Sequence, residues 1–183
     1  MELKGERTLP VDRETAWKEL NDVEALKAAV PGCETLAATG DGEYEVAVNA
    51  AIGPVKALFK GKMKISDVVP PQSYAISFDL HAGLSGFARG QANVSLHEAG
   101  LRETRMVYDV KSTVGGKIAL VGSRLVDAAA ATMSERFFTT FAAQLAGKYP
   151  PAAGAPAAAA IKVPGFFATL WSFLRRLFGA QPK

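Results

Sequence analysis

Apolar residues recur at every second position between Cys33 and Gly115, and this alternation restricts the fold more than any other feature of the chain. The clearest segment covers residues 55–65. Its apolar positions are Val55, Ala57, Phe59, Gly61, Met63 and Ile65, and lysines stand between them at positions 56, 60, 62 and 64. Successive side chains of a strand point to opposite faces, so this segment has one apolar face and one wet face. Similar segments joined by short turns predict an antiparallel meander.

A long segment without proline, residues 116–147, follows the alternating region. Every fourth position in it is apolar: Val121, Leu125, Ala129, Met133, Phe137, Phe141 and Leu145. This spacing predicts one helix of roughly 30 residues, or ~45 Å. The apolar row drifts around the helix axis by ~40° every four residues. We therefore expect a curved sheet that wraps around the helix, because a flat sheet would leave part of the row exposed.

One strand and two short helices are predicted ahead of the alternating region. Residues 2–9 can form a strand that Pro10 ends, and Asp12 is placed to cap a helix over residues 13–20. A second short helix is predicted for residues 23–29. The order is thus a strand, two short helices, five or six strands and a long helix, which predicts an α+β fold with the helix covering one face of the sheet.

The inner faces are rich in small residues, and two interpretations of this remain open. Small residues allow a helix to pack closely on the sheet, but they also leave room for a hollow between the two layers. Apolar walls would suit an apolar guest. The residues predicted to bind such a ligand are Phe59, Met63, Phe78, Leu80, Phe87, Met106, Tyr108, Leu125, Ala129 and Met133.

Several separate segments resemble the CoxG family, which takes its name from a subunit of carbon monoxide dehydrogenase. They are Pro31-Gly32-Cys33-Glu34, Gly53-Pro54-Val55-Lys56-Ala57 with Phe59-Lys60-Gly61-Lys62, Pro70-Pro71 before Ser73-Tyr74, Gly86-Phe87-Ala88-Arg89-Gly90, Gly115-Gly116-Lys117-Ile118-Ala119 with Gly122-Ser123-Arg124-Leu125, and Phe137-Phe138. The resemblance spans residues 1–146. It implies the helix-grip fold of START/Bet v1-like proteins (the SRPBCC superfamily), a curved antiparallel sheet of about six to seven strands around a long C-terminal helix.

The resemblance also implies a function. Members of the family are expected to be non-catalytic accessory proteins of molybdenum hydroxylases such as aerobic carbon monoxide dehydrogenase. They are thought to bring that enzyme to the cytoplasmic membrane and to hold a respiratory quinone, menaquinone or ubiquinone, so that electrons reach the respiratory chain. The apolar ligand is expected to be such a quinone or a lipid. Two alternatives remain: a pure membrane tether with a filled core, and a lipid-binding or cyclase-like enzyme, because helix-grip relatives include cyclases. The inward polar groups that could serve an enzyme are Tyr44, Tyr74, Tyr108 and Thr132.

The C-terminal region has a composition of its own. Residues 1–147 are predicted to form the ligand-binding domain and residues 148–162, rich in proline and alanine, a linker. Residues 163–179 then predict an amphipathic helix of ~24 Å, shorter than the ~30 Å hydrocarbon core of a membrane. The residues expected to contact the membrane are Phe166, Phe167, Leu170, Trp171, Leu174, Arg175, Arg176, Leu177 and Phe178. The alternative is that this helix packs on its own domain or in a groove of a partner.

The net charge of +3 belongs to the C-terminal region. All 18 acidic residues precede Pro150, and four of the 21 basic residues follow it. The domain itself is therefore close to neutral, which argues against nucleic-acid binding. The single cysteine excludes an internal disulfide and fits a reducing compartment. Neither an N-terminal secretory signal nor an apolar run of 18 residues is visible, so we expect a cytoplasmic protein, peripherally associated with the inner face of the membrane.

Residues for metal or nucleophilic chemistry are sparse. His81 and His97 fall on outward strand positions without a second ligand at suitable spacing, so no metal site is predicted. Cys33 has no predicted base nearby and fits a small buried apolar residue. The lysines at 56, 60, 62 and 64 are either a solvated sheet face or a docking patch for an acidic partner.

Overall fold

The computed structural model describes residues 1–151, which form one seven-stranded antiparallel sheet with three α-helices. The elements in chain order are β1 (Glu2–Leu9), α1 (Arg13–Leu20), α2 (Val23–Ala29), β2 (Cys33–Gly40), β3 (Glu43–Ile52), β4 (Val55–Val69), β5 (Ser73–His81), the 3₁₀ turn η1 (Gly83–Ser85), β6 (Phe87–Gly100), β7 (Glu103–Gly115), the 3₁₀ turn η2 (Lys117–Val121) and α3 (Ser123–Lys148). The predicted α+β class and the order of the elements are thereby confirmed.

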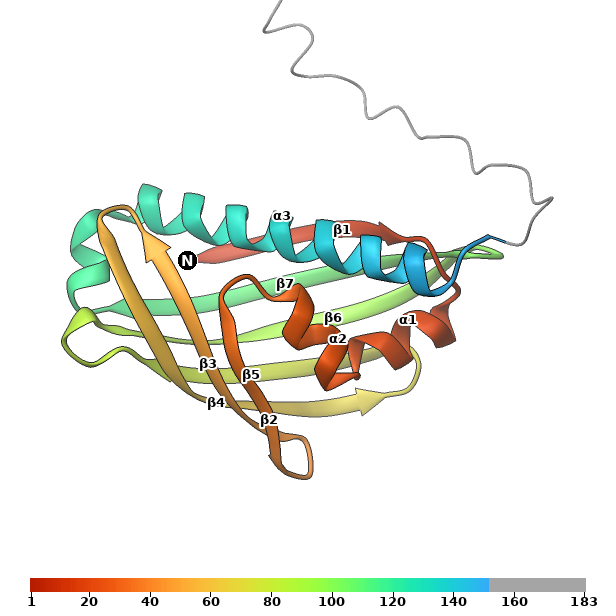
Figure 1. The fold of residues 1–183 in the computed structure, drawn as a ribbon, viewed down its shortest axis with the longest axis horizontal. Coiled ribbons are helices and arrows are strands. Elements are labelled where there is room, and N and C mark those ends of the chain that lie inside the picture. The colour runs from red at the N-terminus through yellow and green to blue at the C-terminus, as the bar shows by residue number, and fades with distance from the viewer. Residues whose placement is uncertain (152–183) are drawn as a thin grey trace, which may run out of the picture. The chain divides into compact units, whose positions relative to one another are not determined.

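The strands follow the order β1-β7-β6-β5-β4-β3-β2. β2 to β7 form the predicted meander, and β1 joins it beside β7, with Leu3 opposite Val110. The curved sheet lies along α3, and α1 and α2 lie together near one end of the sheet (Figure 1). This arrangement is the predicted helix-grip fold.

Local hydrogen bonds explain where the two short helices begin. The Asp12 carboxylate accepts hydrogen bonds from the Thr15 backbone N–H at 2.9 Å and from the Thr15 hydroxyl at 2.8 Å. The Asp22 carboxylate accepts from the backbone N–H groups of Glu24 and Ala25. Both aspartates therefore satisfy backbone donors that a helix N-terminus leaves free.

Glycines inside the strands allow neighbouring backbones to approach closely. A Cβ atom on Gly61 would lie 2.0 Å from the Asp79 carbonyl oxygen of β5, and one on Gly90 would lie 2.3 Å from the Lys111 carbonyl oxygen of β7. Real side chains do not tolerate such distances, so these two positions require glycine. Part of the small-residue content of the inner faces is thus explained by contacts between strands.

The lysines of β4 point to the outer face, as predicted, and acids of neighbouring strands accompany them. Lys62 stands opposite Glu45 of β3 and Asp79 of β5. Lys64 forms an ion pair with Glu43 at 3.1 Å. This mixture of charges is typical of a solvated sheet face.

The long helix begins later than predicted. Residues 117–121 form η2, and α3 starts only at Ser123 because Gly122 has φ 95°, a left-handed conformation that interrupts the helix. The apolar row is therefore buried unevenly. Phe141 and Leu145 are fully buried, whereas Leu125 in the first turn of α3 is 47% exposed.

The hydrophobic core lies where α1, α2 and the second half of α3 meet the sheet. Its members include Leu9, Leu20, Leu96, Met106, Phe138 and Phe141. The buried Thr104 hydroxyl donates a hydrogen bond to the Val11 carbonyl at 2.8 Å, which satisfies a backbone acceptor inside this core. The core therefore holds down the second half of α3.

The end of α3 is fixed on α1 and on the β6–β7 turn. Lys148 and Tyr149 both donate to the buried Glu19 carboxylate, and Arg102 donates to the backbone carbonyl of Tyr149. No helix within residues 1–151 is long and apolar enough to span a membrane. The predicted linker, residues 148–162, enters the described region only with residues 148–151, and the predicted membrane-binding helix, residues 163–179, lies outside the described residues.

Candidate ligand-binding cavity

A cavity of about 360 Å³ lies between the sheet and the helices α1, α2 and α3. Its volume is within the range of ~300–1,000 Å³ that ligand sites usually show. The residues that line it are Leu20, Leu26, Val30, Cys33, Leu36, Val46, Val48, Met63, Ile65, Tyr74, Ile76, Phe78, Leu80, Val94, Met106 and Phe137. Part of its boundary is open to solvent.

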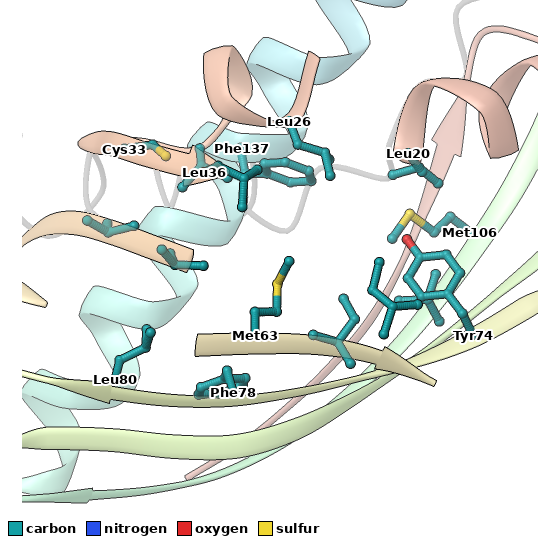
Figure 2. A pocket seen from close by; sticks show the side chains of 16 residues that line it. Leu20, Leu26, Cys33, Leu36, Met63, Tyr74, Phe78, Leu80, Met106 and Phe137 are labelled. Atoms are coloured by element: carbon teal, nitrogen blue, oxygen red, sulfur yellow. The ribbon is translucent and has the colours of Figure 1, made fainter. Parts of the chain in front are cut away.

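Figure 2 shows how the walls are built. Leu26 of α2 and Phe137 of α3 lie on one side, and Met63 of β4 and Phe78 of β5 face them from the sheet. Leu20, Tyr74 and Met106 gather at one end of the cavity. Cys33 and Leu80 lie toward the other end. The cavity is therefore a slot with leucine and phenylalanine side chains on its helical side and aromatic and thioether side chains on its sheet side.

The slot carries almost no polar chemistry. Only Tyr74 and Cys33 among the lining residues have a side-chain atom that can hydrogen-bond strongly or ionise. Burial raises the pKa of the Tyr74 hydroxyl well above its usual range and also raises the pKa of the Cys33 thiol. Both groups are therefore protonated at neutral pH, and Cys33 is not an activated nucleophile.

Within residues 1–151, no charged side chain lines the cavity, and no group of three His, Cys, Asp or Glu side chains could hold a metal ion. Of the polar residues that an enzyme could have used, only Tyr74 reaches the cavity. Tyr44 is half-buried outside it, and the exposed Thr132 hydroxyl donates to the Ala128 carbonyl in its own helix. The arrangement can bind an apolar molecule but offers no acid and base pair.

Four of the ten residues predicted to bind a ligand line the cavity: Met63, Phe78, Leu80 and Met106. Tyr108 instead belongs to the core, where its ring stacks on Phe138 at 5.2 Å between centroids and its hydroxyl lies 3.5 Å from the Ser134 hydroxyl. Phe59 is buried but is not part of the cavity wall.

Phe87 lies away from the cavity, on the other face of the sheet. It precedes Ala88, so the alternation of β6 places it on the same face as Arg89, whose guanidinium lies 4.7 Å from the Phe87 ring centroid. A Cβ atom on Gly115 would collide with the Phe87 ring, so this ring packs against the neighbouring backbone of β7. An inward position for Phe87 is inconsistent with this register.

Leu125, Ala129 and Met133 line a second, separate hollow of about 530 Å³. This hollow lies between the first half of α3 and the end of β3, where Asn49 and Gly53 contribute to its wall. The three residues were predicted to face the cavity on the expectation that α3 is the main cover of the sheet. In the structure Phe137 is the α3 residue that lines the cavity, and Leu26 of α2 lies on the same side.

Several lining residues were not predicted. Val46, Ile65, Ile76 and Val94 share the inner strand face with Met63, so the alternation alone could have identified them. Leu20 and Leu26 come from the short helices, and no local pattern indicates that these helices fold over the same slot.

Comparison with solved structures identifies the class of fold. Similar structures include a conserved protein from Geobacillus kaustophilus, with TM-score 0.77 and 24% identity over 81% of this chain and 97% of that one. A START superfamily protein from Mycobacterium smegmatis gives TM-score 0.62 and 14% identity over 80% and 98% of the two chains. The Zhui aromatase/cyclase from Streptomyces sp. R1128 gives 0.58 and 11% over 84% and 98%. The chain has the START-like helix-grip fold.

The family follows from the sequence. Residues 5–146 match the family model of CoxG, a subunit of carbon monoxide dehydrogenase. The chain therefore belongs to the CoxG family, which confirms the family predicted from its motifs. A comparison with curated proteins found no match. Family and fold together indicate a ligand-binding accessory protein.

Proposed function

We propose that this protein is a non-catalytic accessory protein that binds a respiratory quinone, menaquinone or ubiquinone, in the cavity between the sheet, α2 and α3. The observation that carries the proposal is the apolar slot of about 360 Å³ inside a fold of this family. Phe78 and Phe137 offer ring faces and Met63 and Met106 offer thioethers. Such side chains pack well against a flat conjugated ring.

The same features speak for binding rather than catalysis. Among the described residues that line it, the cavity has two protonated groups and no charge, so it lacks the pair of acid and base that a cyclisation or hydroxylation would need. An open slot of this volume also argues against a pure tether with a filled core.

The partner of this carrier is a molybdenum hydroxylase such as carbon monoxide dehydrogenase, and the family name, which refers to a subunit of that dehydrogenase, supports this choice. Residues 163–179 recruit the complex to the inner face of the cytoplasmic membrane. Their sequence supports this role because large apolar residues recur at helical spacing and Arg175 and Arg176 lie off the apolar face. No acidic residue follows Pro150. Bound quinone then connects the enzyme to the respiratory chain.

A fluorescence titration tests quinone binding. Trp17 makes an edge contact with Tyr74 at 5.5 Å, so it reports on the cavity, and the chain has one other tryptophan, Trp171. In a Trp171→Phe variant we expect decylubiquinone or a short-chain menaquinone to quench the Trp17 emission in a saturable manner. Native mass spectrometry of protein purified from its own membranes should show the mass of a bound quinone. Emission that does not saturate, together with a ligand-free mass, would refute the carrier.

The single cysteine gives a second measure of occupancy. Cys33 lines the cavity, so a bound quinone should slow its alkylation by N-ethylmaleimide. Alkylation of the urea-unfolded protein serves as the control, because its rate should not depend on the quinone.

A further inference from the structure

The Tyr74 hydroxyl is the strongest hydrogen-bond donor in the cavity wall. The Tyr74 side chain is 5% exposed, and Figure 2 shows its oxygen directed away from β5 toward Leu20 and Met106. Within residues 1–151 the structure gives this hydroxyl no hydrogen-bond partner. Because Tyr74 lines the cavity and its hydroxyl has no protein partner there, the hydroxyl is free to donate a hydrogen bond to a ligand atom that accepts one.

The surroundings hold the hydroxyl in place and keep it protonated. The Trp17 ring contacts the Tyr74 ring edge to face, with an angle of 77° between the planes. Burial raises the pKa of the hydroxyl, so it acts as a donor at any physiological pH. Cys33, the other polar lining residue, lies toward the opposite end, and its thiol lies 3.5 Å from the Thr35 carbonyl.

The absence of cations in the wall restricts the ligand further. In the described domain no Lys, Arg or His side chain lines the cavity, so a carboxylate or phosphate head would be buried without a counter-charge. Fatty acids and phospholipid heads are therefore poor ligands for this end of the cavity. An uncharged carbonyl oxygen is the acceptor that fits.

Building on the proposed function, we propose that Tyr74 donates a hydrogen bond to a carbonyl oxygen of the ligand and thereby sets its orientation. The carbonyl-bearing ring lies beside Leu20, Tyr74 and Met106. The hydrocarbon chain runs past Met63 and Phe78 toward Leu80 and Cys33. The ligand class is an apolar molecule with a neutral carbonyl head.

A pair of ligands and a pair of variants test the orientation. The ligands are a short-chain menaquinone and an alkylnaphthalene of the same size, which lacks the carbonyl oxygens. Tyr74→Phe removes only the hydroxyl, and Tyr108→Phe is the matched control because Tyr108 is a buried tyrosine outside the cavity. All measurements use the full chain with Trp171→Phe.

We expect Tyr74→Phe to weaken quinone binding about tenfold and to leave alkylnaphthalene binding unchanged. Tyr108→Phe should change neither. Equal quinone affinity in Tyr74→Phe and in the parent would refute the role of Tyr74 while leaving the carrier intact, and so would a parallel loss for both ligands. Failure of both ligands to bind the parent would refute the proposed function itself and this inference with it.

A second inference comes from the end of the domain where α3 begins. Leu84 of η1 is 87% exposed and Leu120 of η2 is 85% exposed. The two turns lie together, because a Cβ atom on Gly116 would come within 2.4 Å of the Gly86 Cα. The turn between β3 and β4 is also close, with Gly53 beside Leu125 of α3. Three turns thus form one end surface (Figure 1).

The charged residues of this end surface are all basic. Residues 52–56, 82–86 and 116–125 contain Lys56, Lys117 and Arg124 and no acidic residue. Exposed leucines beside cations are the side chains that an anionic bilayer surface binds. We infer that this end of the domain docks on an anionic membrane, with Leu84 and Leu120 inserted among the lipids.

This contact uses side chains of the folded domain, whereas the contact in the proposed function uses residues 163–179. A depth measurement separates the two. An environment-sensitive fluorophore is attached to a single cysteine in the full chain carrying Cys33→Ser. The two test variants are Leu84→Cys and Leu120→Cys. The control is Leu101→Cys, because Leu101 is exposed in the β6–β7 turn.

On vesicles of phosphatidylglycerol and phosphatidylcholine, labels at positions 84 and 120 should shift to the blue. Spin-labelled lipid should quench them at least twofold more than the label at 101. Co-sedimentation without quenching at 84 and 120 would assign the membrane contact to another part of the chain and refute the inference. Absence of co-sedimentation would refute it as well.

Discussion

The Lys148 ammonium donates a 2.7 Å hydrogen bond to the Glu19 carboxylate, which joins the last turn of α3 to α1. Glu19 is 3% exposed, and Tyr149 donates to the same carboxylate oxygen at 2.7 Å. Burial by itself raises the pKa of Glu19, but the hydrogen bonds from Lys148 and Tyr149 together outweigh it, so the pKa lies below its ordinary value. Glu19 therefore holds a full negative charge and fixes the point at which the chain leaves the domain.

Replacement of Glu19 by glutamine should loosen this junction. The neutral amide forms weaker hydrogen bonds to Lys148 and Tyr149 than the carboxylate does, so we expect the Tm to fall by roughly 3–8 °C. Differential scanning calorimetry measures the change. Glu24→Gln on the exposed face of α2 is the matched control and should keep the parental Tm. An unchanged Tm in Glu19→Gln would show that the junction adds nothing to stability.

Removal of the Asp12 cap of α1 should lower the free energy of unfolding and make that free energy depend less on pH in the acid range. The Thr15 backbone N–H lowers the pKa of Asp12 below its ordinary value of 3.8. A carboxyl with a lowered pKa stabilises the fold above its unfolded pKa, and this stability is lost as the pH falls through the folded pKa. Asp12→Ala should cost about 1 kcal/mol at pH 7.

Urea unfolding between pH 7 and pH 2.5 measures that effect. The difference between Asp12→Ala and the parent should shrink below about pH 4. A difference that stays constant down to pH 2.5 would contradict the role of the charged carboxylate.

A larger side chain at position 63 should close the cavity. Met63 points into the slot from β4, so Met63→Trp fills the space that the ligand needs. We expect quinone affinity to fall more than tenfold, with a change in Tm of only a few degrees because the volume was empty. Leu58→Trp lies on the outer face of the same strand and should bind quinone like the parent. Parental affinity in Met63→Trp would place the ligand elsewhere.

Two glycine-to-alanine changes should have opposite effects on the free energy of unfolding. A Cβ atom on Gly61 would meet the Asp79 carbonyl oxygen at 2.0 Å, so Gly61→Ala forces two strands apart and should cost about 2–4 kcal/mol. Gly147 lies in α3 with nothing within 4 Å of the position of its Cβ, so Gly147→Ala should add roughly 0.5–1 kcal/mol. Chemical denaturation of both variants measures the free energies of unfolding, and similar values for the two would contradict the structure.

Local patterns in the sequence predicted those parts of the fold that depend on local chemistry. Asp12 stands directly before α1 and was predicted to cap it. Asp22 caps α2 from the same position, although its role was not predicted. The alternation around Met63 gave the correct inner face, because strand geometry fixes the direction of each side chain. The start of α3 was predicted too early because residues 117–121 contain apolar residues at helical spacing. The backbone conformation of Gly122, which separates these residues from α3, could not be seen in the sequence.

The cavity could be predicted only in part, because its walls meet through tertiary structure. Met63 and Phe78 were found because both lie on the inner face of the sheet, where β4 pairs with β5. Leu26 and Phe137 close the slot from two different helices. The two residues are 111 positions apart in the chain and come together only in the folded domain. Phe87 was misplaced although the alternation of β6, with Ala88 inward and Arg89 outward, already puts Phe87 on the outer face.

The pairing of β1 with β7 also has a consequence for biosynthesis. Leu3 finds its partner Val110 only after more than a hundred further residues have been made, and Phe141 of the core comes later still. The first strand therefore leaves the ribosome long before its neighbour exists, with its edge unpaired. We expect this domain to fold after translation and slowly, as high contact order dictates, and to depend on chaperones during that interval.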